Sequence, residues 1–285
     1  MTFERPVFFG KGVFRSNALG YQLTGPAPSG LLADSALRNS NPWVRLAAVL
    51  QRAKNGDFSA LPVLIECLRE ADSWVLAQAC AELMGDAGSS SFLREVERQF
   101  HADLFEEDVL VFQTKLASTF ALSGLLWTVP VMLEVYERTA DEDDAIIIPL
   151  LLSQVLEPQF SKFSSRDLNV TLSDYRKVVL EKYNGLLKQF KSENTPLYGG
   201  HLFSVKSLAL RLKNRLHGSV IHDVYVAQDR HRFEAATGID CREVFQEGSV
   251  KVLAATAIVE EFLESRESEK YDDGVRYFFG HRIPD

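Results

Sequence analysis

Apolar residues recur at intervals of three and four through most of this 285-residue chain, which is the spacing of one face of an α-helix. Short clusters containing Gly, Pro, Asp or Ser interrupt the pattern and mark the ends of the segments. The clearest start is Asn41-Pro42, an N-cap side chain followed by proline at the first helical position. The pattern predicts helices at residues 30–38, 42–54, 61–68, 73–85, 89–100, 106–120, 127–136, 145–156, 173–191, 203–216, 219–235 and 248–264.

One of these segments is repeated about 31 residues further along the chain. Aligning residues 42–54 with residues 73–85 places Trp43 on Trp74, and a Val and an Ala also match. A repeat length of about 20–50 residues is typical of solenoids, in which supersecondary units stack in a row. We therefore expect Trp43 and Trp74 to occupy equivalent and mostly buried places in successive helix pairs. Solenoids offer extended binding surfaces, so the repeat indicates an architecture more than a reaction.

The paired helices, their Pro/Ser-Trp-Val starts and their Ala-rich first members resemble HEAT-like repeats over residues 30–158, although the third and fourth copies are degenerate. The resemblance implies an all-α fold, specifically an α-solenoid of HEAT-like helix pairs. We expect residues 1–29 to form an extended lead-in. Residues 159–285 are predicted to form a helical C-terminal region packed on the repeats in the same domain, because no long linker intervenes.

The lead-in alternates Gly and Pro residues with aromatic residues. It could be a docking arm for a partner, but the composition favours a segment that packs across the first helices and covers their apolar edge. Thr237-Gly238-Ile239-Asp240 predicts a helix stop in which Gly238 has positive φ, Ile239 folds back and Asp240 caps the next segment. The aromatic stretch 273–285 is predicted to pack on the last helices.

The net charge of −8 is distributed unevenly along the chain. Residues 1–60 carry +4, residues 61–160 carry −13 and residues 161–285 carry +1. An acidic repeat region repels nucleic acid and attracts a basic protein. Two acidic clusters lie about one repeat apart, at the predicted starts of successive helix pairs, so stacking would bring them to one edge. We predict that this acidic edge binds the partner; its residues are Glu106, Glu107, Asp108, Asp141, Glu142, Asp143 and Asp144.

The sequence contains none of the familiar motifs for phosphate binding, zinc peptidases, serine hydrolases or paired CxxC metal sites. Arg230 and Arg232 interleave with the best catalytic candidates and oppose a cation site there. A solvated helix face with local ion pairs is the favoured interpretation, and we predict no enzyme activity, no cofactor and no bound metal. The candidates are His222, Asp223, Asp229, His231 and Glu234.

The compartment is indicated by three further observations. The longest apolar run, at residues 145–152, is too short for a membrane helix, and the N-terminus does not read as a secretory signal. Cys67, Cys80 and Cys241 are too scattered for a disulfide framework and are expected to be buried thiols. These features predict a cytoplasmic protein that does not bind membranes.

The Thr-Gly-Ile-Asp ending, the predicted helix at 250–263 and the aromatic C-terminus together resemble all-helical immunity proteins of bacterial polymorphic toxin systems, over roughly residues 218–285. The resemblance implies stoichiometric neutralisation of a cognate toxin domain. A nuclease would suit an acidic inhibitor, because its substrate groove is basic. Two alternatives stay open: a HEAT-like scaffold or regulatory adaptor, and a helical-repeat enzyme similar to the HEAT-like DNA glycosylases or bilin lyases. The sequence identifies neither the toxin and its affinity, nor the oligomeric state, nor the binding face.

Overall fold

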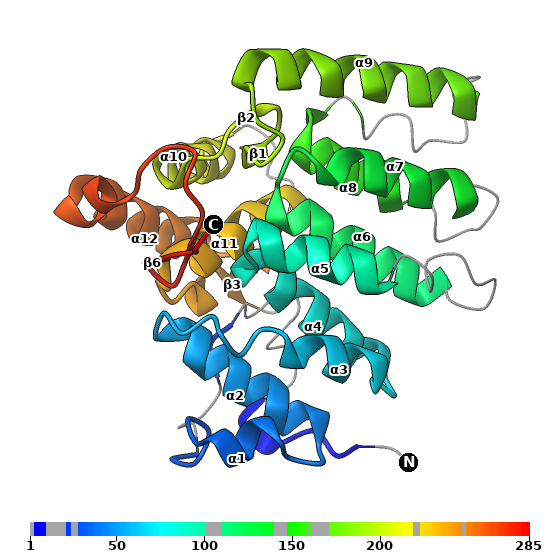
Figure 1. Ribbon diagram of the computed structural model, residues 1–285. Coiled ribbons are helices and arrows are strands. Elements are labelled where there is room, and N and C mark those ends of the chain that lie inside the picture. The colour runs from blue at the N-terminus through cyan, green and yellow to red at the C-terminus, as the bar shows by residue number, and fades with distance from the viewer. Residues whose placement is uncertain are drawn as a thin grey trace. The chain divides into compact units, whose positions relative to one another are not determined.

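The computed structural model describes residues 3–9, 21–23, 28–100, 110–139, 147–158, 160, 171–218, 223–246 and 249–285. These residues are mostly α-helical, as predicted (Figure 1). Most helices lie within a few residues of the predicted boundaries, because apolar stripes and end residues are local signals. The helices are α1 (Asp34–Leu37), α2 (Pro42–Lys54), α3 (Val63–Arg69), α4 (Trp74–Ala87), α5 (Ser90–Phe100), α6 (Leu110–Ser123), α7 (Thr128–Thr139), α8 (Ile147–Val155), α9 (Leu172–Phe190), α10 (Val205–Leu216), α11 (Asp223–Thr237) and α12 (Val252–Glu264).

Short antiparallel hairpins, which the sequence pattern did not predict, lie between the later helices. Strands of two residues are too short to show the alternation that identifies a strand. Two hairpins have tight turns with positive φ at both positions, for example 49° at Phe279 and 78° at Gly280, which suits the twist of paired strands. The hairpins pair β1 (Leu197–Tyr198) with β2 (His201–Leu202), β3 (Phe245–Gln246) with β4 (Ser249–Val250), and β5 (Tyr277–Phe278) with β6 (His281–Arg282).

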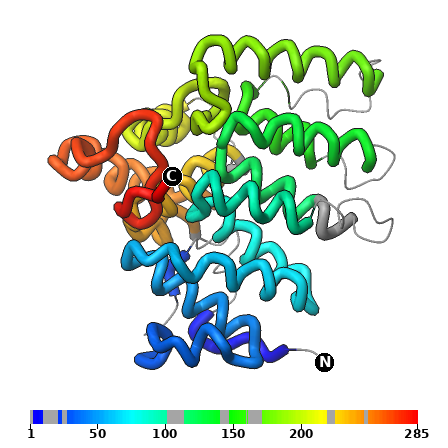
Figure 2. The backbone as a smooth tube through the Cα atoms, in the orientation of Figure 1, coloured from blue at the N-terminus to red at the C-terminus, as the bar shows by residue number. Residues whose placement is uncertain are grey.

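The chain divides into two compact units, and the boundary falls within α4. Unit 1 comprises the described residues up to Cys80 together with Ser204–Pro284, and unit 2 runs from Ala81 to Phe203. Unit 1 therefore contains both the blue-to-cyan start and the yellow-to-red end of the chain in Figure 2. The domain boundaries that the sequence suggests after residues 29 and 158 stay predictions.

In unit 1, α2 starts as its sequence predicts and packs against α1 and α3. The Asn41 side chain caps the helix by accepting a hydrogen bond of 3.0 Å from the Trp43 N–H. The N-terminal segment covers this end of the helix: the ring of Phe9 lies 5.4 Å from that of Trp43, and the Arg5 guanidinium also lies 5.4 Å from the Trp43 ring. For residues 3–9, the prediction that the lead-in packs on the first helices is confirmed.

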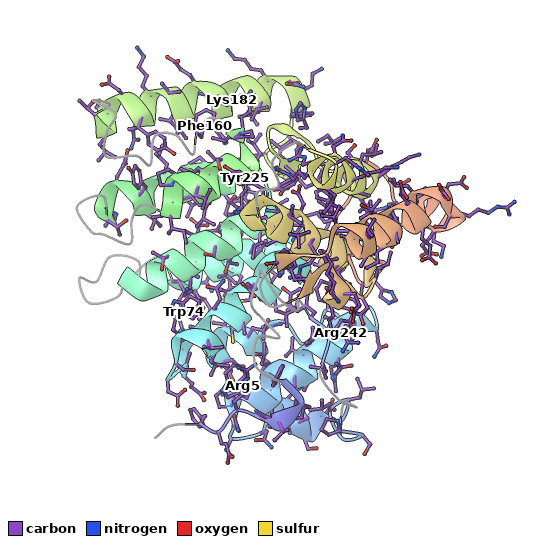
Figure 3. All side chains as sticks on the ribbon, turned by 180° about the vertical axis from the view of Figure 1, so that it is seen from behind. Arg5, Trp74, Phe160, Lys182, Tyr225 and Arg242 are labelled. Carbon is purple, nitrogen blue, oxygen red and sulfur yellow. The ribbon has the colours of Figure 1, made fainter. Side chains whose placement is uncertain are left out.

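The two tryptophans of the repeat lie in the first turns of α2 and α4, but they differ in burial. Trp43 is 2% exposed and Trp74 is 59% exposed, so the expectation that Trp74 is buried is wrong. Figure 3 labels Trp74 at the start of its helix. The physical reason is that Trp43 is covered by Phe9 and Arg5 of the N-terminal segment. An internal repeat predicts the place of a residue in its helix, but not the neighbours that cover it.

In unit 2, α6 packs against α7 and α8, and α7 packs against α8 and α9 (Figure 1). The end of α4 approaches α6 closely: the Thr119 hydroxyl donates to the Ala81 carbonyl at 3.0 Å. A Cβ at Gly85 would lie 2.6 Å from the Thr119 carbonyl oxygen, so this approach requires glycine. Ion pairs attach α9 to the elements beside it, including one between Arg176 and Glu137 of α7.

Candidate functional site

Helix α11 lies inside unit 1 and carries a run of buried charged residues. Asp229, Arg230, His231, Arg232 and Glu234 each have a relative exposure of at most 5%. The solvated helix face that the sequence favoured is therefore wrong. The helix is packed against α10, β4 and β5, and these neighbours cover the faces that the residue types alone had assigned to water.

Among the catalytic candidates that the structure describes, Asp229 and Glu234 form ion pairs with different arginines. His222 lies outside the described residues, and Asp223 is the first residue of α11. Asp229 belongs to an ion pair of its own, in which the Arg215 Nε donates to its Oδ2 at 2.5 Å. The Arg215 guanidinium also lies 4.8 Å from the ring of Tyr225, which Figure 3 labels on the first half of α11.

Both carboxylate oxygens of Glu234 bind groups inside the fold. Oε2 lies 3.2 Å from Nη1 of Arg230, and both side chains are fully buried. Oε1 accepts a hydrogen bond of 2.9 Å from the backbone N–H of Tyr21. Burial raises the pKa of Glu234, while the charges of Arg230 and His231 act in the opposite direction. The carboxylate therefore links α11 to the N-terminal part of the chain.

Tyr21 is fully buried, with its ring surrounded by rings from α11 and the C-terminal hairpin. Its centroid lies 5.3 Å from that of Phe278, 5.4 Å from His231 and 6.4 Å from Phe279. The Lys54 ammonium group donates to the Tyr21 carbonyl at 2.8 Å and lies 4.6 Å from the centroid of the Phe279 ring. Charged side chains thus bind both main-chain polar groups of Tyr21.

Lys54 lies near charged groups of both signs. Burial lowers the pKa of Lys54 to about 8, although the negative charges of Glu234 and Asp240 act to raise it. Burial also acts to raise the pKa of Asp240, but hydrogen bonds from Arg242 outweigh this and lower it. The Arg242 Nε and Nη2 lie 2.9 Å and 2.5 Å from Oδ2 of Asp240. Asp240 also accepts a hydrogen bond of 3.0 Å from the Arg242 N–H at the start of the next segment.

The C-terminal hairpin caps the end of α11. Gly238 has φ of 75° and follows the last residue of the helix, which confirms the predicted stop. The N–H groups of Phe279 and Gly280 donate to the carbonyls of Ala235 and Ala236 at 2.7 Å and 2.8 Å. These carbonyls belong to the last turn of α11, where carbonyl groups have no hydrogen-bond donor within their own helix. The predicted packing of the C-terminal segment is therefore confirmed, and its partner is α11.

This arrangement joins segments that are distant in sequence. The Tyr21 segment, α2, α11 and the C-terminal hairpin all contribute to it. A carboxylate that acts as a general acid or base must place an oxygen within reach of a substrate, and both oxygens of Glu234 are engaged inside the fold. In the part of the chain that the structure describes, no group of three or more His, Cys, Asp or Glu residues could hold a metal ion. None of the described helices is long and apolar enough to span a membrane.

The acidic edge lies outside the described residues, so its geometry stays a prediction; its residues are Glu106, Glu107, Asp108, Asp141, Glu142, Asp143 and Asp144. The residues that the sequence interpretation missed are Tyr21 and Lys54. Tyr21 was one of several aromatics in a Gly- and Pro-rich segment, and Lys54 was an ordinary basic residue in the last turn of its helix. All three cysteines are free and buried, as predicted.

Comparisons of the chain with protein-family models, with curated proteins and with solved structures gave no match.

Proposed function

We propose that this chain is a protein–protein interaction protein, and more specifically a cytoplasmic immunity protein that neutralises a basic bacterial toxin domain by stoichiometric binding. The proposal includes an α-solenoid of HEAT-like helix pairs. Packing between consecutive helices, such as α2 with α3 and α6 with α7, supports that architecture. The function follows the resemblance of the C-terminal part of the sequence to immunity proteins.

The observation that carries an interaction function is the exposure of Trp74. This side chain is 59% exposed in the first turn of α4, and its neighbour Val75 is 36% exposed. Tryptophan is enriched among the few interface residues that supply most of the binding energy. An indole exposed at the end of a helix is therefore a suitable anchor for a protein partner.

Charge supports a basic partner in particular. Residues 61–160 carry −13, and Glu66, Glu70 and Asp72, which precede Trp74, are exposed. Arg45 neutralises part of this local charge through ion pairs with Glu70 at 2.5 Å and Glu66 at 3.9 Å. The rest of the acidic stretch increases the rate at which a cationic protein associates.

The buried charges of α11 also support binding over catalysis. Asp229 and Glu234 looked like catalytic candidates in the sequence, but each is held in an ion pair inside unit 1.

The function is tested by capturing the tagged chain from its host, identifying bound proteins by mass spectrometry, and expressing each candidate in indicator cells. We expect a basic domain that arrests growth when expressed alone, forms a 1:1 complex, and loses its toxicity when this chain is co-expressed. A captured toxin that still arrests growth in the presence of excess chain would refute immunity. A bound partner that is not toxic would favour the adaptor alternative.

Two variant sets then locate the interface. Trp74→Ala should weaken binding at least about tenfold, as expected for an anchor residue. Leu253→Ala is the matched control, because Leu253 is 88% exposed on α12 of the same unit. If both variants bind the partner equally well, Trp74 is not part of the interface.

The second set concerns the acidic edge. Replacing Asp141, Glu142, Asp143 and Asp144 with the corresponding amides should slow association at low ionic strength and flatten its salt dependence. The control neutralises the same number of exposed acidic residues in unit 1, namely Glu261, Glu264, Glu269 and Asp273. If both sets slow association equally, only net charge matters and the edge is not the binding surface.

A further inference from the structure

We propose that unit 1 contains a binding site for an aromatic residue in a polypeptide segment, and that the chain's own Tyr21 fills this site in cis. A partner segment with the same chemistry would displace residues 21–23. This site uses neither Trp74 nor the residues of the acidic edge, and the proposal does not depend on toxin binding.

The contacts of Tyr21 have the two components of peptide recognition, a pocket for a side chain and partners for the main chain. The ring lies among His231, Phe278 and Phe279, and is fully buried. Glu234 accepts from the main-chain N–H at 2.9 Å, and Lys54 donates to the carbonyl at 2.8 Å. The adjacent Gln22 side chain donates to the Gly238 carbonyl at 3.3 Å. Any residue offers the main-chain groups, so the ring supplies the selectivity.

The walls of the site are connected to one another without residues 21–23. The C-terminal hairpin is attached to α11 by the hydrogen bonds from Phe279 and Gly280 to the last turn of the helix. The same hairpin reaches the end of α2, where a Cβ on Gly56 would lie 2.8 Å from Nδ1 of His281. These contacts connect α2, α11 and the hairpin without involving residues 21–23.

Two charged side chains, Lys54 and Glu234, use the main chain of Tyr21 as a hydrogen-bond partner. Lys54 and Glu234 have opposite charges in a largely buried place, where an ion without hydrogen-bond partners is costly. The N–H and carbonyl of Tyr21 meet these two needs at once. His231 and Arg230 of α11, together with Asp240 and Arg242 of the segment that follows it, complete the charged surroundings. If residues 21–23 left the site, Lys54 and Glu234 would lose these hydrogen bonds. The loss favours binding of another segment that offers the same main-chain groups.

The test uses the full-length Tyr21→Ala chain and acetyl-Tyr-Gln-Leu-amide, which carries the side chains of residues 21–23. We expect millimolar peptide to raise the melting temperature of the variant by a few degrees, about as mass action predicts. The control peptide, acetyl-Ala-Gln-Leu-amide, should have no effect. The wild-type chain should bind the tyrosine peptide at least about tenfold more weakly, because its own segment fills the site in most molecules. Adding Glu234→Gln to the variant should reduce the rescue.

Equal effects of the two peptides on the folded variant would overturn the proposal, since Tyr21 would then be an ordinary core residue. A second measurement covers the case in which Tyr21→Ala does not fold. Hydrogen exchange of the wild-type chain should show the Tyr21 amide at least about tenfold less protected than the Phe233 amide of α11, because a displaceable segment opens locally. Equal protection would mean that Tyr21 is released only when unit 1 unfolds, which also overturns the proposal.

Discussion

Replacing Gly238 with alanine tests the cap that joins α11 to the C-terminal hairpin. The backbone at Gly238 has φ of 75°, a region that costs other residues about 1–2 kcal/mol. An added Cβ would also lie 2.8 Å from Cδ1, 3.2 Å from Cγ and 3.3 Å from Cα of Phe279. The last of these atoms belongs to the main chain, so rotation of the ring alone cannot relieve the contact.

The hairpin must therefore move away from the helix. Its displacement weakens the hydrogen bonds from Phe279 to the Ala235 carbonyl, 2.7 Å, and from Gly280 to the Ala236 carbonyl, 2.8 Å. Overfilling a packed site costs about 1–3 kcal/mol. With the backbone cost, Gly238→Ala should lower the free energy of unfolding by about 2–5 kcal/mol.

Urea denaturation followed by circular dichroism measures this loss. Because two compact units need not unfold together, hydrogen exchange of the α11 amides reports unit 1 separately. Gly30→Ala is the control within the same unit, since nothing lies within 4 Å of an added Cβ there; it should change stability by no more than about 0.5 kcal/mol. Gly185→Ala, in the middle of α9 and equally open, should stabilise unit 2 by about 0.5–1 kcal/mol.

If Gly238→Ala is as stable as Gly30→Ala, the close packing of the hairpin on the end of α11 does not contribute to stability, and the reasoning is wrong. Gly238→Asn separates the two costs, because asparagine tolerates positive φ but keeps the Cβ. If the asparagine variant regains wild-type stability, the close contact with Phe279 contributes nothing and only the backbone conformation matters.

Three further predictions concern buried groups. Glu234→Gln removes the negative charge that lies 3.2 Å from the buried Arg230 guanidinium and should cost about 3–5 kcal/mol, whereas the exposed control Glu261→Gln should change stability by less than about 0.5 kcal/mol; equal stability by urea denaturation would contradict the buried ion pair. The pKa of Lys54 is lowered from 10.5 to about 8, so the folded state favours the neutral amine. Relative to Lys54→Met, the free energy of unfolding of the wild type should therefore rise by up to about 3 kcal/mol between pH 8 and pH 10.5, and stay level below pH 8. If the difference between the two proteins does not change with pH, the ammonium group is not buried. The three buried thiols should react with a thiol reagent only after denaturation, and fast reaction of the native chain would place at least one of them at the surface.

Local signals in the sequence determined most of the helices and some of their ends. The apolar spacing and the Asn41 cap predicted α2, because a side chain two residues away satisfies the free N–H of Trp43. Gly238 was predictable for the same reason, since a left-handed helix end requires glycine wherever it occurs. The two-residue strands carry no such local signal.

Burial and the candidate site were decided by tertiary structure alone. Trp43 and Trp74 share a repeat position, yet Trp43 is buried and Trp74 is mostly exposed, because Phe9 packs on Trp43 from another part of the chain. The sequence favoured a solvated face for the charged residues of α11, but other segments cover the helix and supply some of the partners of its charges, such as Arg215 for Asp229 and Tyr21 for Glu234. A sequence pattern reports the preference of each residue for water, whereas the free energy of burying a charge depends on partners that only the fold brings within hydrogen-bonding distance.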